Sequence, residues 1–288
     1  MSPELRGTPE RRRVETAPAP PEERTDEVLD HEPQQIAERA ADVGEHRLDR
    51  SRFDVLITGA IGGVEVSIGG LAAMAVVGSL HEAVPGMPLY ARLAVGGLVF
   101  PIGFLFVIMG RSELFTENFL IPVVAVLGRQ RSVASLLRIW TMSWAGNVIG
   151  CAAIAALLSV PHAVGDPIVA GYREYTAYKL AVPGTGTFVS AVLAGLIMTV
   201  LTWLMVAIRH PVAKCVAIFA AGYVIFASNV SHAIVGAAIL FAGFVHAQHT
   251  ATDVAGWLGL ATAGNLLGGI GFVTLFRIAQ AREKQRSG

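Results

Sequence analysis

Long apolar stretches alternate with short polar connections between residues 53 and 277. A helix that spans a bilayer needs about 20 mostly apolar residues. Six stretches meet this requirement, at residues 54–80, 91–127, 133–159, 185–208, 213–246 and 253–276. The pattern therefore predicts an all-α integral membrane protein with six transmembrane helices.

Polar residues interrupt the second and the fifth stretch, from Gly110 to Asn118 and from Ser228 to His232. A separate landmark, Ala-Gly-Asn-Val-Ile-Gly at 145–150, recurs 118 positions later as Ala-Gly-Asn-Leu-Leu-Gly at 263–268, and the two interruptions share this offset. One common offset indicates an internal duplication. Duplicated transporter folds place broken helices at matching points near the bilayer midplane, so we expect the functional site there.

Basic residues near the span ends lie mostly on one side of the predicted membrane domain. Twelve lie on the side that carries both termini, against three on the other, Arg92, Arg173 and Lys179. The positive-inside rule then places both termini in the cytoplasm. Each half has three spans, an odd number, so we expect two inverted three-helix repeats with broken second and fifth helices, a transport architecture.

Composition supports a membrane protein, because 53% of the residues are hydrophobic, only 15% are charged, and the mean hydropathy is +0.56. Residues 1–52 hold 13 of the 22 acidic residues and predict a cytoplasmic tail, disordered over 1–34 and then an amphipathic helix near the membrane surface. Its apolar stripe would contain Ile36, Ala40 and Val43. We expect a transmembrane channel domain at 53–277 and a cytoplasmic C-terminal tail at 278–288.

His232 is the histidine expected deepest in the membrane, where ionisable groups are costly and usually functional. It would offer a positive charge or pass a proton to a weak-acid anion. The alternative is a neutral, structural histidine bonded to a backbone carbonyl. Half-helices resuming at Phe119 and Ala233 would point free amides at the centre, which suits an anion. Breaks that are only packed kinks are the alternative there.

Three charged side chains cluster in the first break, namely Arg111, Glu113 and Glu117. They would hold the loop as a structural ion cluster, or Arg111 would add positive potential to an anion path. We expect Asn147 and Asn265 to tie the third helix of each half to the opposing break. Pairs of small residues four apart, such as those at 59 and 63, predict close helix packing.

The sequence of the chain resembles that of the formate/nitrite transporter family over about residues 53–277. Glu-Leu-Phe-Thr at 113–116 reproduces the family's first-loop motif, and His232 falls on its central histidine. The resemblance implies an aquaporin-like homopentamer in the inner (cytoplasmic) membrane that carries formate, nitrite or similar small anions, with no cofactor, metal or nucleic acid. It also implies a pore constriction and substrate path, lined here by Leu114, Phe115, Thr116, Ile225, Phe226 and Thr199.

The chain departs from the family pattern at several of these positions. Arg111 and Glu117 replace glycines, Ile225 replaces a phenylalanine, and Thr199 replaces a pore-facing asparagine. The family's lysine before the fourth span has no aligned partner, although Lys179 is nearby. A pore for neutral solutes or water and a membrane scaffold without transport therefore remain alternatives to a proton-linked anion transporter. An enzyme is not expected, because no metal-ligand cluster or nucleophile–base pair stands out.

Overall fold

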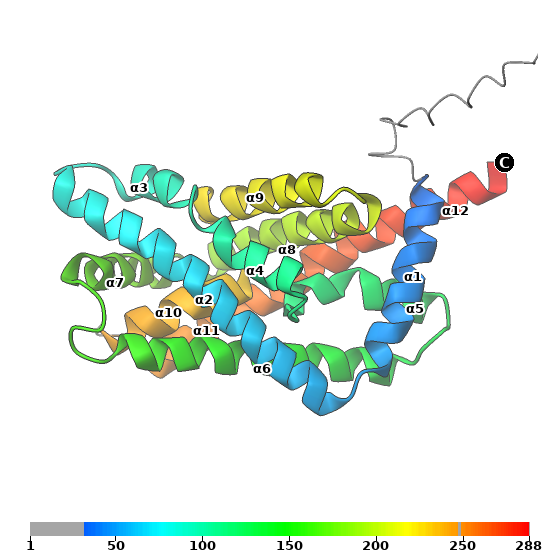
Figure 1. Cartoon of the computed structure of the whole chain (residues 1–288), viewed down its shortest axis with the longest axis horizontal. Coiled ribbons are helices and arrows are strands. Elements are labelled where there is room, and N and C mark those ends of the chain that lie inside the picture. The colour runs from blue at the N-terminus through cyan, green and yellow to red at the C-terminus, as the bar shows by residue number, and fades with distance from the viewer. Residues whose placement is uncertain (1–31, 247–248, 288) are drawn as a thin grey trace, which may run out of the picture.

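The computed structural model describes residues 32–246 and 249–287, which form twelve α-helices, a 3-10 helix (η1) and a π-helix (η2). The first part contains α1 (Pro33–Asp49), α2 (Arg52–Ala83), α3 (Leu89–Gly96), α4 (Pro101–Gly110), η1 (Phe115–Phe119), α5 (Ile121–Leu127) and α6 (Val133–Leu158). The second contains α7 (Asp166–Ala181), α8 (Gly184–Ala207), α9 (Pro211–Ala227), α10 (Ala233–Val245), α11 (Ala251–Leu266), η2 (Leu267–Thr274) and α12 (Leu275–Ser287). Figure 1 shows most of them running along the long axis of one bundle.

Among the described residues, five helical segments are long and apolar enough to cross a membrane. They are Arg52–Ala83, Leu89–Gly110, Val133–Leu158, Gly184–Ala207 and Ala251–Glu283. The remaining predicted stretch is divided between two shorter apolar helices, α9 and α10, on either side of the second break. The chain is thus an all-helical, multi-pass membrane protein.

Small residues bring the long helices into backbone contact. A Cβ atom added to Gly63 of α2 would lie only 2.1 Å from the carbonyl oxygen of Asn147 in α6. In the other half, a Cβ atom added to Gly195 of α8 would lie 2.2 Å from the carbonyl oxygen of Asn265 in α11. Larger side chains would force both pairs apart, which confirms the predicted packing role of small residues.

Helix α1 lies across one end of the bundle, where it packs against α5 and α12 (Figure 1). Its buried residues are Ile36, Ala40, Gly44 and Leu48, a strict four-residue repeat. Val43, expected on the same stripe, is exposed instead. A single helical face continues through i, i+4 and i+8, so Gly44 takes the inward position. Of the predicted disordered tail, residues 1–31 lie outside the described residues.

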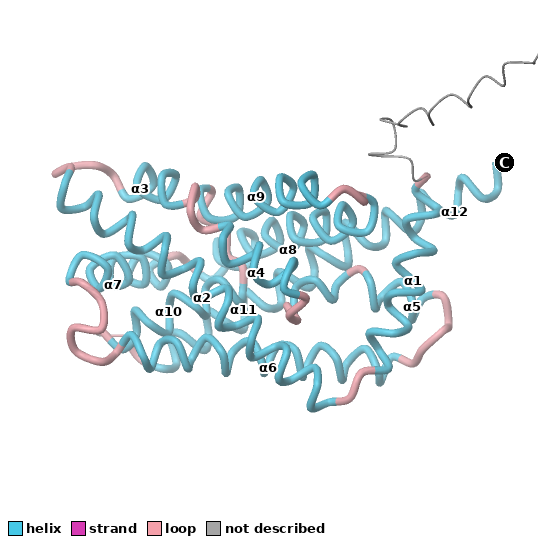
Figure 2. Tube along the Cα trace, viewed as in Figure 1, coloured by secondary structure: helices cyan, strands magenta, loops and turns pink. Residues whose placement is uncertain are grey.

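The two breaks lie inside the bundle, and Figure 2 shows the loop after α4 away from both of its ends. Helix α4 ends at Gly110 because Arg111 adopts left-handed backbone angles (φ 62°). The chain then forms η1, and α5 begins at Ile121 rather than at the expected Phe119. In the second break, α9 ends at Ala227 and α10 begins at Ala233, as expected.

Candidate functional site

The two breaks meet at a contact between Thr116 and His232. Thr116 Oγ1 lies 2.9 Å from His232 Nε2, and both residues are at most 1% exposed. His232 is also the N-cap of α10, where its Nδ1 accepts the Val235 N–H at 3.1 Å. Because Nδ1 is an acceptor, the ring is the neutral tautomer with its proton on Nε2, which donates to Thr116 Oγ1.

Aromatic rings continue from this contact toward α7. The Phe104 ring centroid lies 5.8 Å from that of His232 and 5.2 Å from that of Phe100. Phe100 stacks on Phe226 at 5.0 Å, and Phe226 in turn stacks on Tyr175. Phe226 was expected at the site, whereas the two phenylalanines of the α3–α4 region were missed. Their apolar sequence context did not distinguish them from neighbouring residues.

The other predicted path residues are buried near the breaks. Leu114 and Phe115 lie in the first break, and Ile225 lies beside Phe226 at the end of α9. Thr199 of α8 is fully buried, and its Oγ1 forms no hydrogen bond with the described residues. It faces Gly269 of η2, since a Cβ atom there would lie 2.5 Å from Oγ1.

Each of the two asparagines related by the 118-residue offset holds one break. Asn147 Oδ1 accepts the Phe115 N–H at 2.9 Å, while its Nδ2 donates to the carbonyl oxygen of Glu113 at 2.8 Å. Asn265 Oδ1 accepts the Ala233 N–H at 2.8 Å, and its Nδ2 donates to the Ser231 carbonyl at 3.0 Å. Each asparagine therefore holds the break of its own half, and the expectation that it reaches the opposing break is wrong.

The same bonds correct the expectation of free amides at the centre. In the first turn of α10, the Ala233 N–H is taken by Asn265 and the Val235 N–H by the His232 ring. In the first break, the Phe115 N–H is taken by Asn147. These three amides are bonded to side chains and are not free to bind an anion. The positive end of the α10 dipole still points toward the break.

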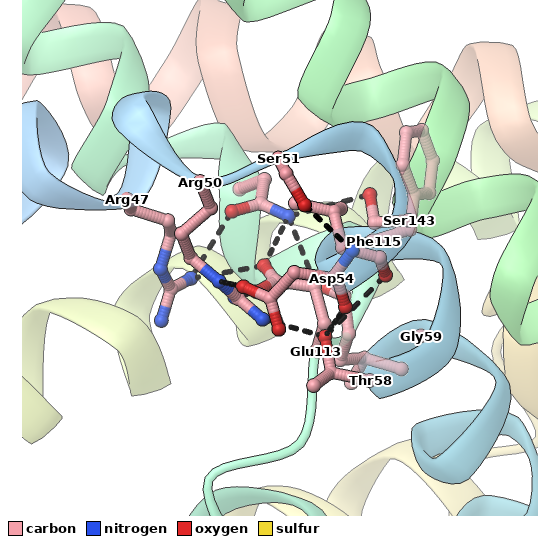
Figure 3. Close-up of polar contacts among 12 residues, drawn as sticks. Arg47, Arg50, Ser51, Asp54, Thr58, Gly59, Glu113, Phe115 and Ser143 are labelled. Atoms are coloured by element: carbon pink, nitrogen blue, oxygen red, sulfur yellow. Dashed lines mark hydrogen bonds and ion pairs between the residues drawn. The ribbon is translucent and has the colours of Figure 1, made fainter.

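The predicted ion cluster of the first break is arranged differently. Figure 3 shows Arg47 and Arg50 pointing toward Glu113, which is 2% exposed. Arg50 pairs with one carboxylate oxygen, and Arg47 lies 3.5 Å from the other. Asn118 Nδ2 also donates to Glu113, at 2.7 Å. Arg111 forms no ion pair with either glutamate of the loop among the described residues, because its side chain leaves α4 at an exposed turn.

Lys179 of α7 reaches the second break, a contact that sequence reasoning missed. Its ammonium donates to the Asn229 carbonyl oxygen at 2.5 Å and lies 3.4 Å from Ser231 Oγ. The residue is 3% exposed. The sequence shows a lysine in the segment before the fourth predicted span, but nothing in the sequence indicates that it contacts the second break. A buried cation thus lies close to the centre on the α7 side.

A sequence model described as formate/nitrite transporter matches residues 34–279. The chain is 27% identical to the "Formate channel BtFdhC" of Bacillus thuringiensis, over 89% of this chain and 98% of that protein. It is 32% identical to the "Probable formate transporter" of Methanothermobacter thermautotrophicus, over 52% of this chain and 53% of that one.

Two solved structures are similar in fold. An "FNT family ion channel" superposes with a TM-score of 0.74 and 22% identity, covering 85% of this chain and 98% of that one. A "Pentameric formate channel with formate bound" superposes with a TM-score of 0.66 and 18% identity, covering 79% and 96%. Because the family match extends over most of the sequence, the chain belongs to the formate/nitrite transporter family.

Proposed function

We propose that this chain is a channel or proton-linked carrier for small monovalent anions such as formate and nitrite, with His232 as the central group. The observation that carries the proposal is the 2.9 Å contact between Thr116 Oγ1 and His232 Nε2, where the two broken helices meet. Relatives named as formate channels and formate transporters support this substrate class. Backbone that leaves a helix at membrane depth is tolerated where it lines a path or is covered by protein.

The surroundings of His232 favour transfer of the substrate as a neutral acid. Leu114 and Phe115 are buried in the first break, Ile225 and Phe226 are buried at the end of α9, and the Phe104 ring lies 5.8 Å from that of His232. An ion is costly in such an apolar wall, whereas a protonated formic or nitrous acid is not charged. Thr199 adds a buried hydroxyl that has no hydrogen-bond partner among the described residues and could bond to a passing solute.

The hydrogen bonds of His232 define how a proton would be taken up. Nε2 already carries a proton and donates to Thr116, while Nδ1 is occupied by the Val235 N–H. A second proton must therefore displace that N–H from Nδ1 and open the first turn of α10. The imidazolium formed in this way would donate a proton to the anion and then recover its cap. Proton transfer is thus coupled to the helix that borders the path.

Lys179 would concentrate anions on the α7 side of the centre. Its ammonium contacts the carbonyl of Asn229 and the hydroxyl of Ser231, and no carboxylate pairs with it among the described residues. Burial lowers the pKa of Lys179, because the charged form loses its hydration. The amine would therefore pass between charged and neutral forms more readily than an exposed lysine.

The proposed architecture has six crossings in two inverted repeats, with α4, η1 and α5 forming the second crossing and α9 and α10 the fifth. The matched contacts of Asn147 and Asn265 with the two breaks support this pairing. We place the chain in the inner membrane of the cell. Both termini would lie in the cytoplasm, because basic residues are concentrated on the side that carries them. The solved structure described as a pentameric formate channel supports a homopentamer as part of this proposal. Residues 53–277 would form the channel domain, flanked by the two cytoplasmic tails.

Flux of formate and nitrite in proteoliposomes, at acidic and neutral pH, tests the proposal. The wild type should show flux that rises at acidic pH, and His232→Asn should abolish or uncouple it. Thr116→Val should reduce the flux while leaving the fold intact, because it removes only the hydroxyl. Rapid water or glycerol flux without anion flux would instead indicate a neutral-solute pore. No flux of any solute from folded protein would indicate a membrane scaffold.

A further inference from the structure

A cavity of about 230 Å³ lies at the α1 end of the membrane domain, between α1, the end of α4, the first break and α8. Charged side chains from three of these segments line it, together with polar and apolar residues. The charged ones are Arg47, Arg50, Arg111, Glu113 and Glu117. Its volume suits a molecule of a few heavy atoms with its hydration.

Two of the three arginines are already engaged. Arg47 donates to Asn118 Oδ1 at 3.1 Å and lies near Glu113, while Arg50 pairs with Glu113 and with Asp54 at 2.6 Å. These pairs hold α1 on the first break. They leave little capacity for a further anion, because the guanidinium groups face carboxylates.

Arg111 is the arginine of the cavity whose guanidinium has no partner among the described residues. Its side chain is exposed, and among the described residues it forms no hydrogen bond or ion pair. Its left-handed backbone (φ 62°) ends α4 and directs the chain into the break, so the position of this residue is set by the fold. A guanidinium with five free donors is suited to bind a carboxylate or a planar oxyanion with two hydrogen bonds.

Glu117 lines the same cavity and lies on η1 next to Thr116, which contacts His232. The Glu117 side chain is half-buried and forms no hydrogen bond or ion pair among the described residues. The 3-10 helix thus presents one residue to the cavity and the neighbouring one to the centre. The cavity and the Thr116–His232 contact are therefore connected through consecutive residues of one short helix.

We propose that this cavity is a binding site for the transported anion, with Arg111 as its donor and Glu117 as the residue that restricts it to monovalent anions. This proposal rests on the proposed function. At mildly alkaline pH, with three arginines and two ionised glutamates, the lining has a net charge of +1, which one formate or nitrite neutralises. A dianion such as sulfate would leave a net negative charge in a half-buried cavity and would be repelled.

Binding to the detergent-solubilised full chain, measured by isothermal titration calorimetry at mildly alkaline pH, tests the site. Formate and sulfate are the probes. Arg111→Gln should weaken formate binding about tenfold or more, the effect of losing a charge-assisted hydrogen bond. Glu117→Gln should retain formate and gain sulfate binding. Arg129→Gln is the matched control, since Arg129 is also exposed with a left-handed backbone (φ 61°) but does not line the cavity.

Formate binding in Arg111→Gln equal to that of Arg129→Gln would overturn the site, as would sulfate exclusion that persists in Glu117→Gln. Flux measurements separate this proposal from the transport proposal. If the wild type carries formate and Arg111→Gln leaves the KM unchanged, transport stands and the site fails. If the wild type binds formate in an Arg111-dependent way and carries none, the site stands and transport fails.

Discussion

Replacement of Asn147 by leucine should destabilise the membrane domain strongly. The amide of Asn147 is fully buried and makes three hydrogen bonds to backbone groups. Oδ1 accepts the Phe115 N–H at 2.9 Å, and Nδ2 donates to the carbonyls of Gly59 and Glu113 at 2.8 Å each. The Gly59 carbonyl belongs to helix α2, but the two groups of the break have no helical partner.

Asn147→Leu leaves the Phe115 N–H and the Glu113 carbonyl unsatisfied in a buried position. Each such group costs about 1–3 kcal/mol, so the pair costs about 2–6 kcal/mol. Hydrogen bonds measured within membranes average about 0.6 kcal/mol, and three of them set a lower limit of about 2 kcal/mol. We therefore expect the free energy of unfolding to fall by about 2–6 kcal/mol.

Unfolding by SDS, followed by tryptophan fluorescence, measures this loss. Thr141→Val is the matched control in the same helix, because Thr141 is exposed and its hydroxyl donates to the Leu137 carbonyl one turn earlier. It should change stability by less than about 0.5 kcal/mol. Asn265→Leu should resemble Asn147→Leu, since it loses the equivalent bonds at the second break. A loss for Asn147→Leu no larger than that of the control would refute the reasoning.

Three further predictions concern other contacts of the bundle. Glu113→Gln should release α1 from the first break, because two arginines lose their carboxylate, and hydrogen exchange of the α1 amides should then accelerate. Gly150→Leu should prevent α2 and α6 from packing, since even a Cβ atom would lie 2.0 Å from the Ala60 carbonyl oxygen; the folded yield after size-exclusion chromatography should drop sharply, whereas unchanged yield would contradict the close approach. The Arg131 hydrogen bond lowers the pKa of Asp49, so its stabilising effect is present above the usual aspartate pKa of about 3.9 and is lost as pH falls below it. Asp49→Asn should therefore lower the Tm more at neutral pH than near pH 3, roughly one unit below that pKa, and an equal Tm difference at both would contradict this assignment.

Much of the fold could be predicted because membrane helices have a strong local signal. Apolar length locates α2, α6, α8 and α11, and polar interruptions locate both breaks. The second break was predicted to the residue, since His232 caps α10 with its own side chain. The first was less well placed, because η1 is a 3-10 helix whose hydrogen bonding has no separate hydropathy pattern.

The candidate site was only partly predictable for a different reason. The 118-residue offset placed Asn147 and Asn265 at equivalent positions, and the family motif identified Thr116 and His232. Neither the offset nor the motif showed that Thr116 and His232 are in contact, because the two residues are 116 positions apart in the sequence. Phe104 has an unremarkable apolar context in the sequence and becomes part of the site only through the 5.8 Å approach of its ring to His232.

The sequence by itself determined that the chain is a helical membrane protein, where its helices are interrupted, and to which family it is similar. Those properties depend on hydropathy, residue spacing and short motifs, which are local. Only the tertiary structure decided that Glu113 pairs with Arg47 and Arg50, that Lys179 reaches the second break, and that Arg111 remains open in a cavity. Side-chain partners so far apart in sequence are set by how helices pack, and helix packing depends on the shape of the whole bundle.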